Sequence, residues 1–207
     1  TVRISGDGLS RLGWAGTIGF ARVALVCWQR VFALPDGWLH ITILDVGDGD
    51  ALLIQTPQGR NVLVDGGSFA SLLADAIGRR LPFGQQNIDY LVIAATGDAR
   101  IASLPRAMDH FMTKNVLWAG PMGGSYNARE LQKRLAADRI PITEAKAGHV
   151  LDMGDGARLE MISVSERGAI LLLEWDRFRA LLPVGLDFES QEALLRDTRY
   201  TPLTALL

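Results

Sequence analysis

Apolar and polar residues alternate along the stretch at residues 39–67, and this alternation predicts three short strands in succession. The Asp48-Gly49 pair between the first two is a two-residue turn of the type that closes hairpins. The three predicted strands cover residues 39–45, 51–56 and 61–64. The stretch therefore predicts a small antiparallel sheet at the start of a larger domain.

The third predicted strand ends in Asp65-Gly66-Gly67. A carboxylate followed by two glycines at a strand end places a charge on a tight loop with exposed backbone at a sheet edge. Functional sites are often built on such loops, so Asp65 is a candidate site residue.

The pattern after residue 67 changes to alternating helices and strands, and from residue 142 it returns to strands. The middle part begins with a predicted helix, capped near Ser68 and stopped by Pro82, and a buried strand at 89–95. A second helix is predicted from an apolar stripe of Ile101, Leu104, Met108, Phe111 and Met112. A strand at 115–119 and a helix with the capping box Asn127-x-x-Glu130 follow. The last part predicts strands at 150–152, 157–164, 169–175 and 178–184, with a hairpin turn at Asp176-Arg177, and a short helix at 190–196. This order predicts an α/β protein built as an αββα sandwich.

Residues 12–34 form an apolar run near the N-terminus, and its 23 residues are enough to span a bilayer. Arg22 lies near its middle, where a charge costs about 2.5–3.5 kcal/mol on insertion scales, so an amphipathic or partly buried helix remains an alternative. No small-residue cleavage site follows the run, which argues against a signal peptide.

Charge is distributed unevenly over the 207 residues. The first 34 residues carry a net charge of +3, whereas the whole chain carries −2, which leaves −5 for the remainder. An acidic domain does not bind DNA through its overall field. The single Cys27 excludes an intrachain disulfide framework.

Three motifs in fixed order carry a resemblance to a known family. They are residues 44–50 (LDVGDGD), 54–59 (IQTPQG) and 64–67 (VDGG). In this order the motifs resemble the opening of the metallo-β-lactamase fold, in the form found as the soluble domain of ComEC-type DNA-uptake (competence) proteins. The family has glutamine where this chain has Asp48. The resemblance implies an αββα sandwich at residues 36–207, truncated at its C-terminus, and a preceding region, residues 1–35, that ends a membrane helix and includes a linker.

The same resemblance locates the positions where the family binds two zinc ions. After the strand that corresponds to residues 90–94 the family carries T-H-x-H-x-D-H. With the register set by Leu91-Val92 before the loop and Ile101 after it, Ala95, Gly97, Ala99 and Arg100 occupy the four ligand positions. None of these side chains binds zinc, and Arg100 places a permanent positive charge there. The family's metal-bridging aspartate aligns with Gly185, unless a two-residue slip brings in Asp187.

Four aspartates could remain from such a site, and two interpretations of them stay open. Asp45, Asp50 and Asp65 either remain from the ancestral site as groups that contact the metal ligands rather than the metal, or hold turns together by accepting backbone N–H bonds. Asp98 could pair with Arg100 across the vacated pocket, or Asp65 and Asp98 could recruit one Mg²⁺ ion. The three histidines, His40, His110 and His149, lie far apart in the expected fold and are not joined into a metal site.

The sequence therefore favours a domain with no catalytic residue, no metal and no cofactor, its ancestral zinc site being lost. What the resemblance implies is the soluble domain of a DNA-internalisation protein of the bacterial cell membrane, on the extracytoplasmic side. Its partners would be the membrane through residues 12–34, single-stranded DNA, and the remainder of the competence protein. The alternative is a metal-dependent phosphodiesterase or nuclease with a rebuilt site. The basic clusters Arg79-Arg80, Arg129/Lys133/Arg134 and Arg177/Arg179 are expected to be solvated faces rather than a DNA path.

Overall fold

The computed structural model describes residues 19–20, 35–82, 86–166, 168–184 and 203–207. Its contacts divide the chain into two units, Thr1–Leu34 and Pro35–Leu207. Apart from Gly19 and Phe20, which are helical, the apolar run at 12–34 lies outside the described residues. No helix in the described ranges has both the length and the apolar character to cross a membrane.

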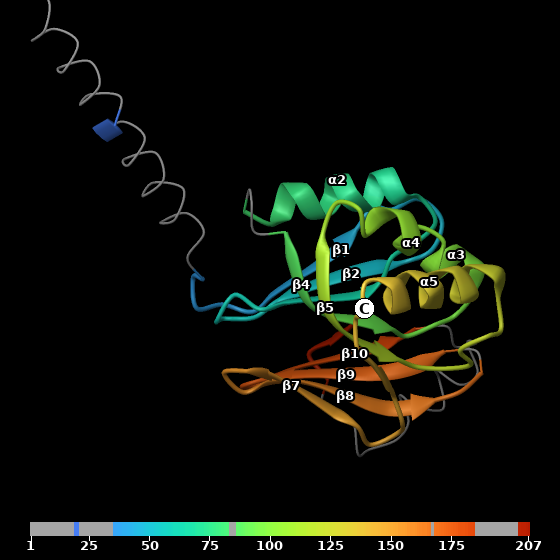
Figure 1. Cartoon of the computed structure of the whole chain (residues 1–207). Helices are drawn as coiled ribbons and strands as arrows, with labels where there is room; N and C mark the ends of the chain where they lie inside the picture. The colour runs from blue at the N-terminus through green and yellow to red at the C-terminus, as the bar shows by residue number, and fades with distance from the viewer. Residues whose placement is uncertain (1–18, 21–34, 83–85, 167, 185–202) are drawn as a thin grey trace, which may run out of the picture. The chain divides into compact units, whose positions relative to one another are not determined.

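Residues 35–207 form two sheets and one helical layer (Figure 1). The first sheet has the strand order β1-β2-β3-β4-β5-β6, and the second has the order β11-β10-β9-β8-β7. The strands of the first sheet are β1 (His40–Leu44), β2 (Ala51–Gln55), β3 (Asn61–Asp65), β4 (Asn87–Ile93), β5 (Met112–Trp118) and β6 (Ile142–Glu144). Those of the second are β7 (Val150–Gly154), β8 (Ala157–Val164), β9 (Ala169–Trp175), β10 (Phe178–Pro183) and β11 (Ala205–Leu206).

The helices α2 (Ala70–Arg80), α3 (Asp98–Ile101), α4 (Leu104–Ala107) and α5 (Tyr126–Ala137) cover one face of the first sheet. The other face of that sheet packs on the second sheet. Side chains of β3 alternate between the two cores: Leu63 faces the helices, while Val62 and Val64 face the second sheet. Burial on both faces explains why these strands read as continuous apolar runs.

The predicted hairpins are confirmed, because their turns are encoded locally. β1 and β2 pair antiparallel from His40↔Gln55 to Leu44↔Ala51, and β9 and β10 pair antiparallel around a turn at Asp176, whose φ is 52°. β3 then runs parallel to β4, and β4 parallel to β5. The carboxyl ends of β3 and β4 therefore lie side by side at one edge of the sheet.

Three helix predictions are wrong in detail. The stripe from Ile101 to Met112 is not one helix: it contains the short helices α3 and α4, and Met112, 69% exposed, begins β5. Pro105 has no N–H to continue a helix, and it lies near the start of α4, where a proline is tolerated. The N-cap of α5 is Ser125, whose hydroxyl accepts from the Ala128 N–H, so the capping box at Asn127 is wrong.

The cap of α2 differs as well. Its N-cap is Phe69 and no side chain caps it, because the hydroxyl of Ser68 is turned toward two other loops. At the other end of the chain, β11 pairs parallel with β10, which gives the apolar C-terminal residues a partner strand. The helix predicted at 190–196 lies outside the described residues.

Candidate functional site

The candidate site lies where the loops that follow β1, β3 and β4 meet. Asp65 ends β3 with a φ of 53°, a left-handed conformation that turns the chain sharply into Gly66-Gly67. Its Oδ1 accepts hydrogen bonds from the backbone N–H groups of Ala94 (2.8 Å) and Ala95 (3.3 Å). The carboxylate of one strand end thus holds the loop that leaves the neighbouring strand.

The backbone of Arg100 fixes the same loops from the other side. Its carbonyl oxygen accepts from the N–H groups of Gly66 (2.9 Å) and Gly67 (2.8 Å). The side-chain Nη1 of Arg100 lies 2.9 Å from Oδ2 of Asp50, on the loop between β1 and β2. One residue therefore connects three loops, and its guanidinium stands beside Asp65.

Two serines complete these loop contacts. The hydroxyl of Ser68 bridges the carbonyl oxygens of Asp48 (2.8 Å) and Ala99 (3.0 Å). The buried hydroxyl of Ser103 donates to the carbonyl oxygen of Gly66 at 2.7 Å. These side chains satisfy backbone carbonyls that turns leave without partners. The sequence indicates only that serines favour turns, so the distant carbonyl oxygens to which Ser68 and Ser103 donate could not be predicted.

Gly49 permits the closest approach between the loops. Its φ is +84°, and a Cβ at this position would lie 2.2 Å from the carbonyl oxygen of Ala99. The turn after β1 can therefore touch the first turn of α3 only because residue 49 has no side chain.

Asp65 is 1% exposed, and its Oδ2 has no hydrogen-bond partner within the described part of the chain. Burial raises the pKa of Asp65 to about 7, while the N–H groups of Ala94 and Ala95 and the positive charge of Arg100 oppose that rise. A carboxyl with this pKa exchanges a proton near neutrality. No such behaviour was expected from the sequence.

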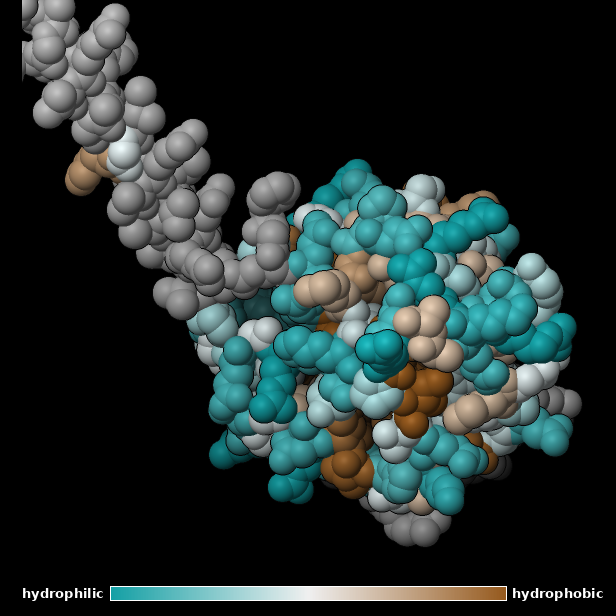
Figure 2. All heavy atoms as spheres, viewed as in Figure 1, coloured by the Kyte–Doolittle hydropathy of each residue, from teal (hydrophilic) through white to brown (hydrophobic). Residues whose placement is uncertain are grey.

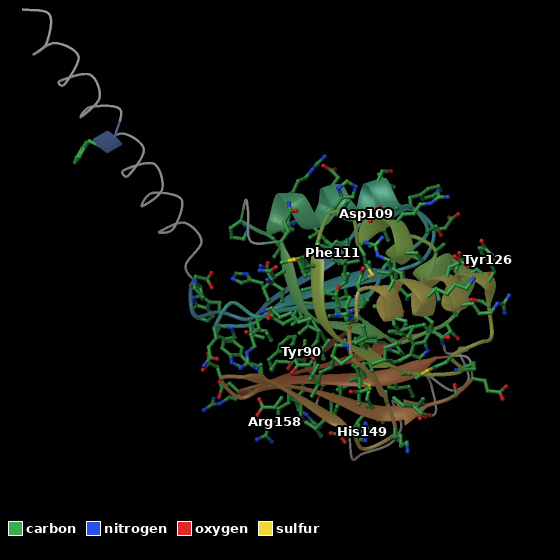
Figure 3. All side chains as sticks on the ribbon, in the orientation of Figure 1. Tyr90, Asp109, Phe111, Tyr126, His149 and Arg158 are labelled. Carbon is green, nitrogen blue, oxygen red and sulfur yellow. The ribbon has the colours of Figure 1, made fainter. Side chains whose placement is uncertain are left out.

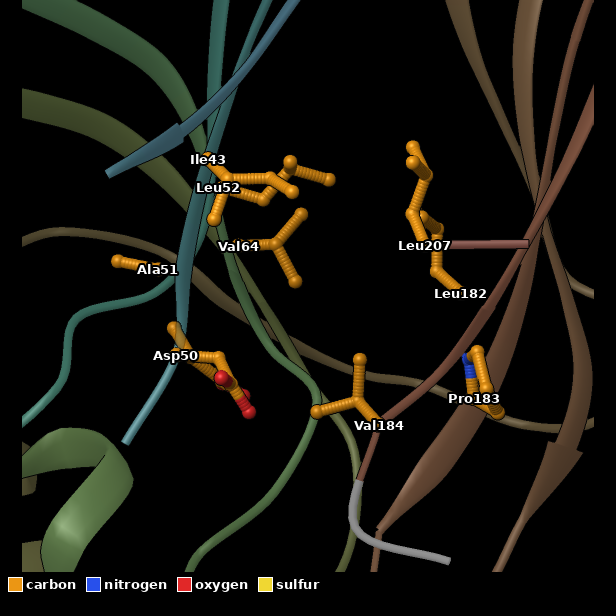
Figure 4. Close-up of a pocket in the computed structure, with 10 residues that line it drawn as sticks. Ile43, Asp50, Ala51, Leu52, Val64, Leu182, Pro183, Val184 and Leu207 are labelled. Carbon is orange, nitrogen blue, oxygen red and sulfur yellow. The ribbon is translucent and has the colours of Figure 1, made fainter. Parts of the chain in front are cut away.

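A cavity of about 170 Å³ opens beside these residues, between the two sheets (Figure 4). Ile43, Leu52 and Val64 line it from the first sheet, and Leu182, Val184 and Leu207 from the second. Asp50 lies at one end of it, and Asp65 also contributes to its wall. The cavity is mainly apolar, with its carboxylates confined to the loop side.

The structure places the other predicted site residues around this cluster without joining them into one group. Asp98 accepts from the side-chain amide of Asn127 at 3.0 Å, and Arg100 pairs with Asp50, so the suggested pairing of Asp98 with Arg100 is wrong. Asp45, Gly97 and Ala99 are exposed, and Ala95 is buried. Gly185 lies outside the described residues.

The histidines do not approach the cluster. His40 is exposed on β1 and bonds Asp36 (2.7 Å), and His149 accepts from the backbone N–H of Lys146 (3.4 Å). His110 is exposed in the bend after α4 rather than in a helix. Within the described residues, no three His, Cys, Asp or Glu side chains converge as a metal site requires.

These residues do not fit a zinc ion. A zinc ion needs converging nitrogen, sulfur or carboxylate donors, and the loop after β4 offers one carboxylate, Asp98, which accepts from the side-chain amide of Asn127. The side chains of Ala95 and Ala99 end in methyl groups, Gly97 has none, and Arg100 ends in a guanidinium. Asp50 is engaged by the ion pair with Arg100, and two backbone N–H groups engage Oδ1 of Asp65, which leaves the buried Oδ2 of Asp65 without a partner among the described residues. The positive charge of Arg100 would also repel a cation at this place.

Comparison with known proteins finds likeness in structure only. No protein-family model matches the chain. No curated protein matches it either. Among solved structures, Zn²⁺-bound PqqB from Methylobacterium extorquens matches with a TM-score of 0.53 at 12% identity, covering 77% of this chain and 56% of that one.

Two further structures are similar at lower scores. A metallo-β-lactamase from Cronobacter sakazakii matches with a TM-score of 0.48 at 16% identity, covering 84% of this chain and 70% of that one. A flavo-di-iron protein from Thermotoga maritima matches with a TM-score of 0.45 at 18% identity, covering 65% of this chain and 32% of that one. The chain thus spans about a third of the di-iron protein and just over half of PqqB. At these identities the likeness concerns the fold alone, and residues 35–207 have the metallo-β-lactamase fold.

Proposed function

We propose that residues 36–207 are a non-catalytic soluble domain of a ComEC-type DNA-internalisation protein. The proposal is supported by the three ordered motifs at residues 44–50, 54–59 and 64–67, each of which has a structural task in this fold. The first supplies the turn that packs on α3, the second the turn between β2 and β3, and the third the carboxylate that holds the loop after β4.

One observation carries the non-catalytic part of the proposal. Arg100 is paired with Asp50 at 2.9 Å, and the alignment implied by the three motifs puts Arg100 at a metal-ligand position of the family. A fixed guanidinium supplies no activated hydroxide and no Lewis acid, and both are needed for metal-assisted phosphodiester hydrolysis. The scaffold of the site is kept, and its chemistry is replaced by an ion pair.

The role that remains is structural or in binding, for example guiding one DNA strand toward a membrane channel. In this account residues 12–34 end the last membrane helix, and the domain lies on the extracytoplasmic side of a bacterial membrane. Residues 35–207 carry a net charge of −5, and several of their basic side chains pair with acids, as in Arg79–Asp75, Lys133–Glu130, Arg134–Asp138, Arg134–Asp109 and Arg179–Glu174. The face of residues 35–207 shown in Figure 2 is mostly hydrophilic, with hydrophobic side chains in small patches. Contact with DNA is therefore expected to need the rest of the competence protein.

A nuclease assay tests this proposal. The purified chain is incubated with single- and double-stranded DNA in Zn²⁺, Mn²⁺ or Mg²⁺, and Asp65→Ala and Asp98→Ala are tested in parallel. We expect no cleavage that depends on both the metal and the protein. Metal-dependent cleavage by the wild type that either substitution abolishes would overturn the proposal in favour of a phosphodiesterase with a rebuilt site. Cleavage that survives in both variants would point to a contaminating nuclease and would leave the expected result standing.

A further inference from the structure

The end of the domain where the chain joins residues 1–34 carries an exposed aromatic pair. Trp38 is 64% exposed, and its ring meets the partly exposed ring of Trp175 edge to face, with centroids 6.3 Å apart. Trp175 ends β9, next to the hairpin turn at Asp176-Arg177. An indole this exposed is rarely needed for the core, and tryptophan is enriched where proteins meet the headgroup layer of a bilayer.

The backbone before Trp38 is held in place and is not a free tether. Pro35 packs on the turn between β2 and β3, since a Cβ on Gly59 would lie 2.8 Å from the proline Cγ. Asp36 accepts from the backbone N–H of Trp38 at 3.0 Å and bonds the ring of His40 at 2.7 Å. The aromatic pair is therefore fixed relative to the point where the chain leaves the domain.

Three arginines on neighbouring turns and strands form no ion pair with another described residue, whereas most acids at the same end of the domain are hydrogen-bonded. Arg60, Arg158 and Arg177 are exposed and form no ion pair with another described residue; Figure 3 labels Arg158. The acids at the same end are bonded internally: Asp36 to His40, Asp152 to the Gly154 N–H, Asp155 to Gln58 and Glu174 to Arg179. Asp176 differs from these acids, because it forms no hydrogen bond or ion pair with another described residue through its side chain. Arginines without ion-pair partners can bind anionic lipid headgroups. The arginines and acids of this face nearly balance in formal charge, so we expect a secondary membrane contact rather than a strong anchor.

Chain length sets how far this face can lie from a membrane. Trp38 lies four residue steps after residue 34, and four steps span at most about 14 Å when fully extended. The headgroup layer is about 5 to 8 Å deep on each side of the hydrocarbon core. If the apolar run at 12–34 ends at the hydrocarbon boundary, Trp38 lies in or next to the headgroup layer.

We propose that the face formed by Trp38 and Trp175 rests on the lipid headgroups and fixes the orientation of the domain on the membrane. This inference rests on the proposed membrane association of residues 12–34.

The test uses the full chain reconstituted in liposomes that contain a fraction of anionic lipid and a nitroxide quencher near the headgroup. In a Cys27→Ser background, a fluorophore is attached at Arg177→Cys or, as control, at Tyr126→Cys. Tyr126 matches Trp38 in exposure, 65% against 64%, and Figure 3 shows it at the opposite end of the domain from the blue segment that begins at residue 35. A domain of this size has a radius of gyration of about 16 Å, so a label at Tyr126 stays outside the headgroup layer.

We expect the label at residue 177 to be quenched at least about twofold more than the label at residue 126, given the shallow depth of the headgroup layer. Trp38→Ser should bring the quenching at residue 177 down toward the control value, while Trp38→Phe should largely preserve it. Equal quenching at both labels in chains that pellet with the liposomes would overturn the proposed orientation alone. Chains that fail to pellet would overturn the membrane association of residues 12–34, and this inference with it.

Discussion

Arg100 and Asp50 lie fifty residues apart in the sequence, yet Nη1 of the arginine is 2.9 Å from Oδ2 of the aspartate. The contact joins the loop after β1 to helix α3 directly above the buried end of β3. In the proposed alignment with the metallo-β-lactamase family, Arg100 stands at a position where that family has a metal ligand. The stability of this ion pair and the proton affinity of nearby Asp65 are therefore coupled, and both can be measured.

Replacing Arg100 with alanine is expected to change stability only slightly. The side chains are 27% and 73% exposed, and ion pairs this exposed contribute less than about 1 kcal/mol. Urea unfolding at pH 7 measures the loss, with Arg106→Ala as the control because Arg106 is exposed and forms no ion pair with a described residue. A loss above about 2 kcal/mol would show that Arg100 is a structural centre and not the replacement of a lost ligand.

The pKa of Asp65 predicts an unusual dependence of stability on pH. Its value is about 7 in the folded chain and 3.8 in the reference state, so between these values the folded chain binds a proton that the unfolded chain does not. The contribution of Asp65 to stability therefore grows as pH falls from about 7 toward 4, with a slope of at most about 1.4 kcal/mol per pH unit. The difference in unfolding free energy between wild type and Asp65→Asn, measured from pH 5 to 8, isolates this contribution. A difference that stays constant over this range would contradict the assigned pKa.

Gly49→Ala is expected to destabilise the fold by more than about 2 kcal/mol, because it combines a left-handed backbone with a Cβ placed 2.2 Å from the Ala99 carbonyl oxygen. Gly97→Ala is the matched control on the facing loop. Gly97 has a φ of −64° and open space at its Cβ position, so alanine there should be neutral or stabilise by up to about 1 kcal/mol. Thermal unfolding of both variants measures this difference, and we expect a lower melting temperature for Gly49→Ala than for Gly97→Ala. Similar melting temperatures would contradict the close contact between Gly49 and Ala99.

Ser125→Ala should cost about 1 kcal/mol, because the serine hydroxyl caps α5 through the Ala128 N–H at 3.1 Å. A smaller loss is expected for Glu130→Ala, because among the described residues Glu130 pairs only with exposed Lys133, and it closes no capping box. Chemical denaturation of both variants checks the order of the two losses. The reverse order would restore the capping box at Asn127.

The strands could be predicted from the sequence because alternation and turn chemistry act over a few residues. The motif at residues 44–50 predicted the first hairpin, and Asp176 in the turn after β9 predicted another. The helix drawn through Ile101 and Met112 failed because an apolar stripe does not reveal that Pro105 restarts the chain in a new helix, nor that Met112 is exposed on β5.

The contacts that define the candidate site could not be predicted from the sequence as readily as the strands. Asp98 stands two residues from Arg100, so a local pairing was expected, but the partners are Asn127 and Asp50, which come from other elements. Likewise, the protonation of Asp65 depends on complete burial, which the third strand alone does not specify. Such contacts follow from the packing of distant segments and have no signal in local spacing.

Restoring the family's ligand loop is expected to recover metal binding only in part. The variant Ala95→His, Gly97→His, Ala99→Asp and Arg100→His supplies four donors on one loop. It lacks the bridging aspartate, since Gly185 occupies that position in the alignment. Isothermal titration with Zn²⁺ should therefore detect one weak site in this variant. Two tight sites would show that other residues of the chain complete the ligand set.

The zinc content of the wild-type chain, purified without chelator and measured by elemental analysis, tests the central claim most directly. With Arg100 paired to Asp50 and the aligned ligand positions lacking donors, the account predicts far less than one zinc, manganese or iron ion per chain. About one ion per chain, retained through gel filtration and lost on Asp65→Ala or Asp98→Ala, would contradict it.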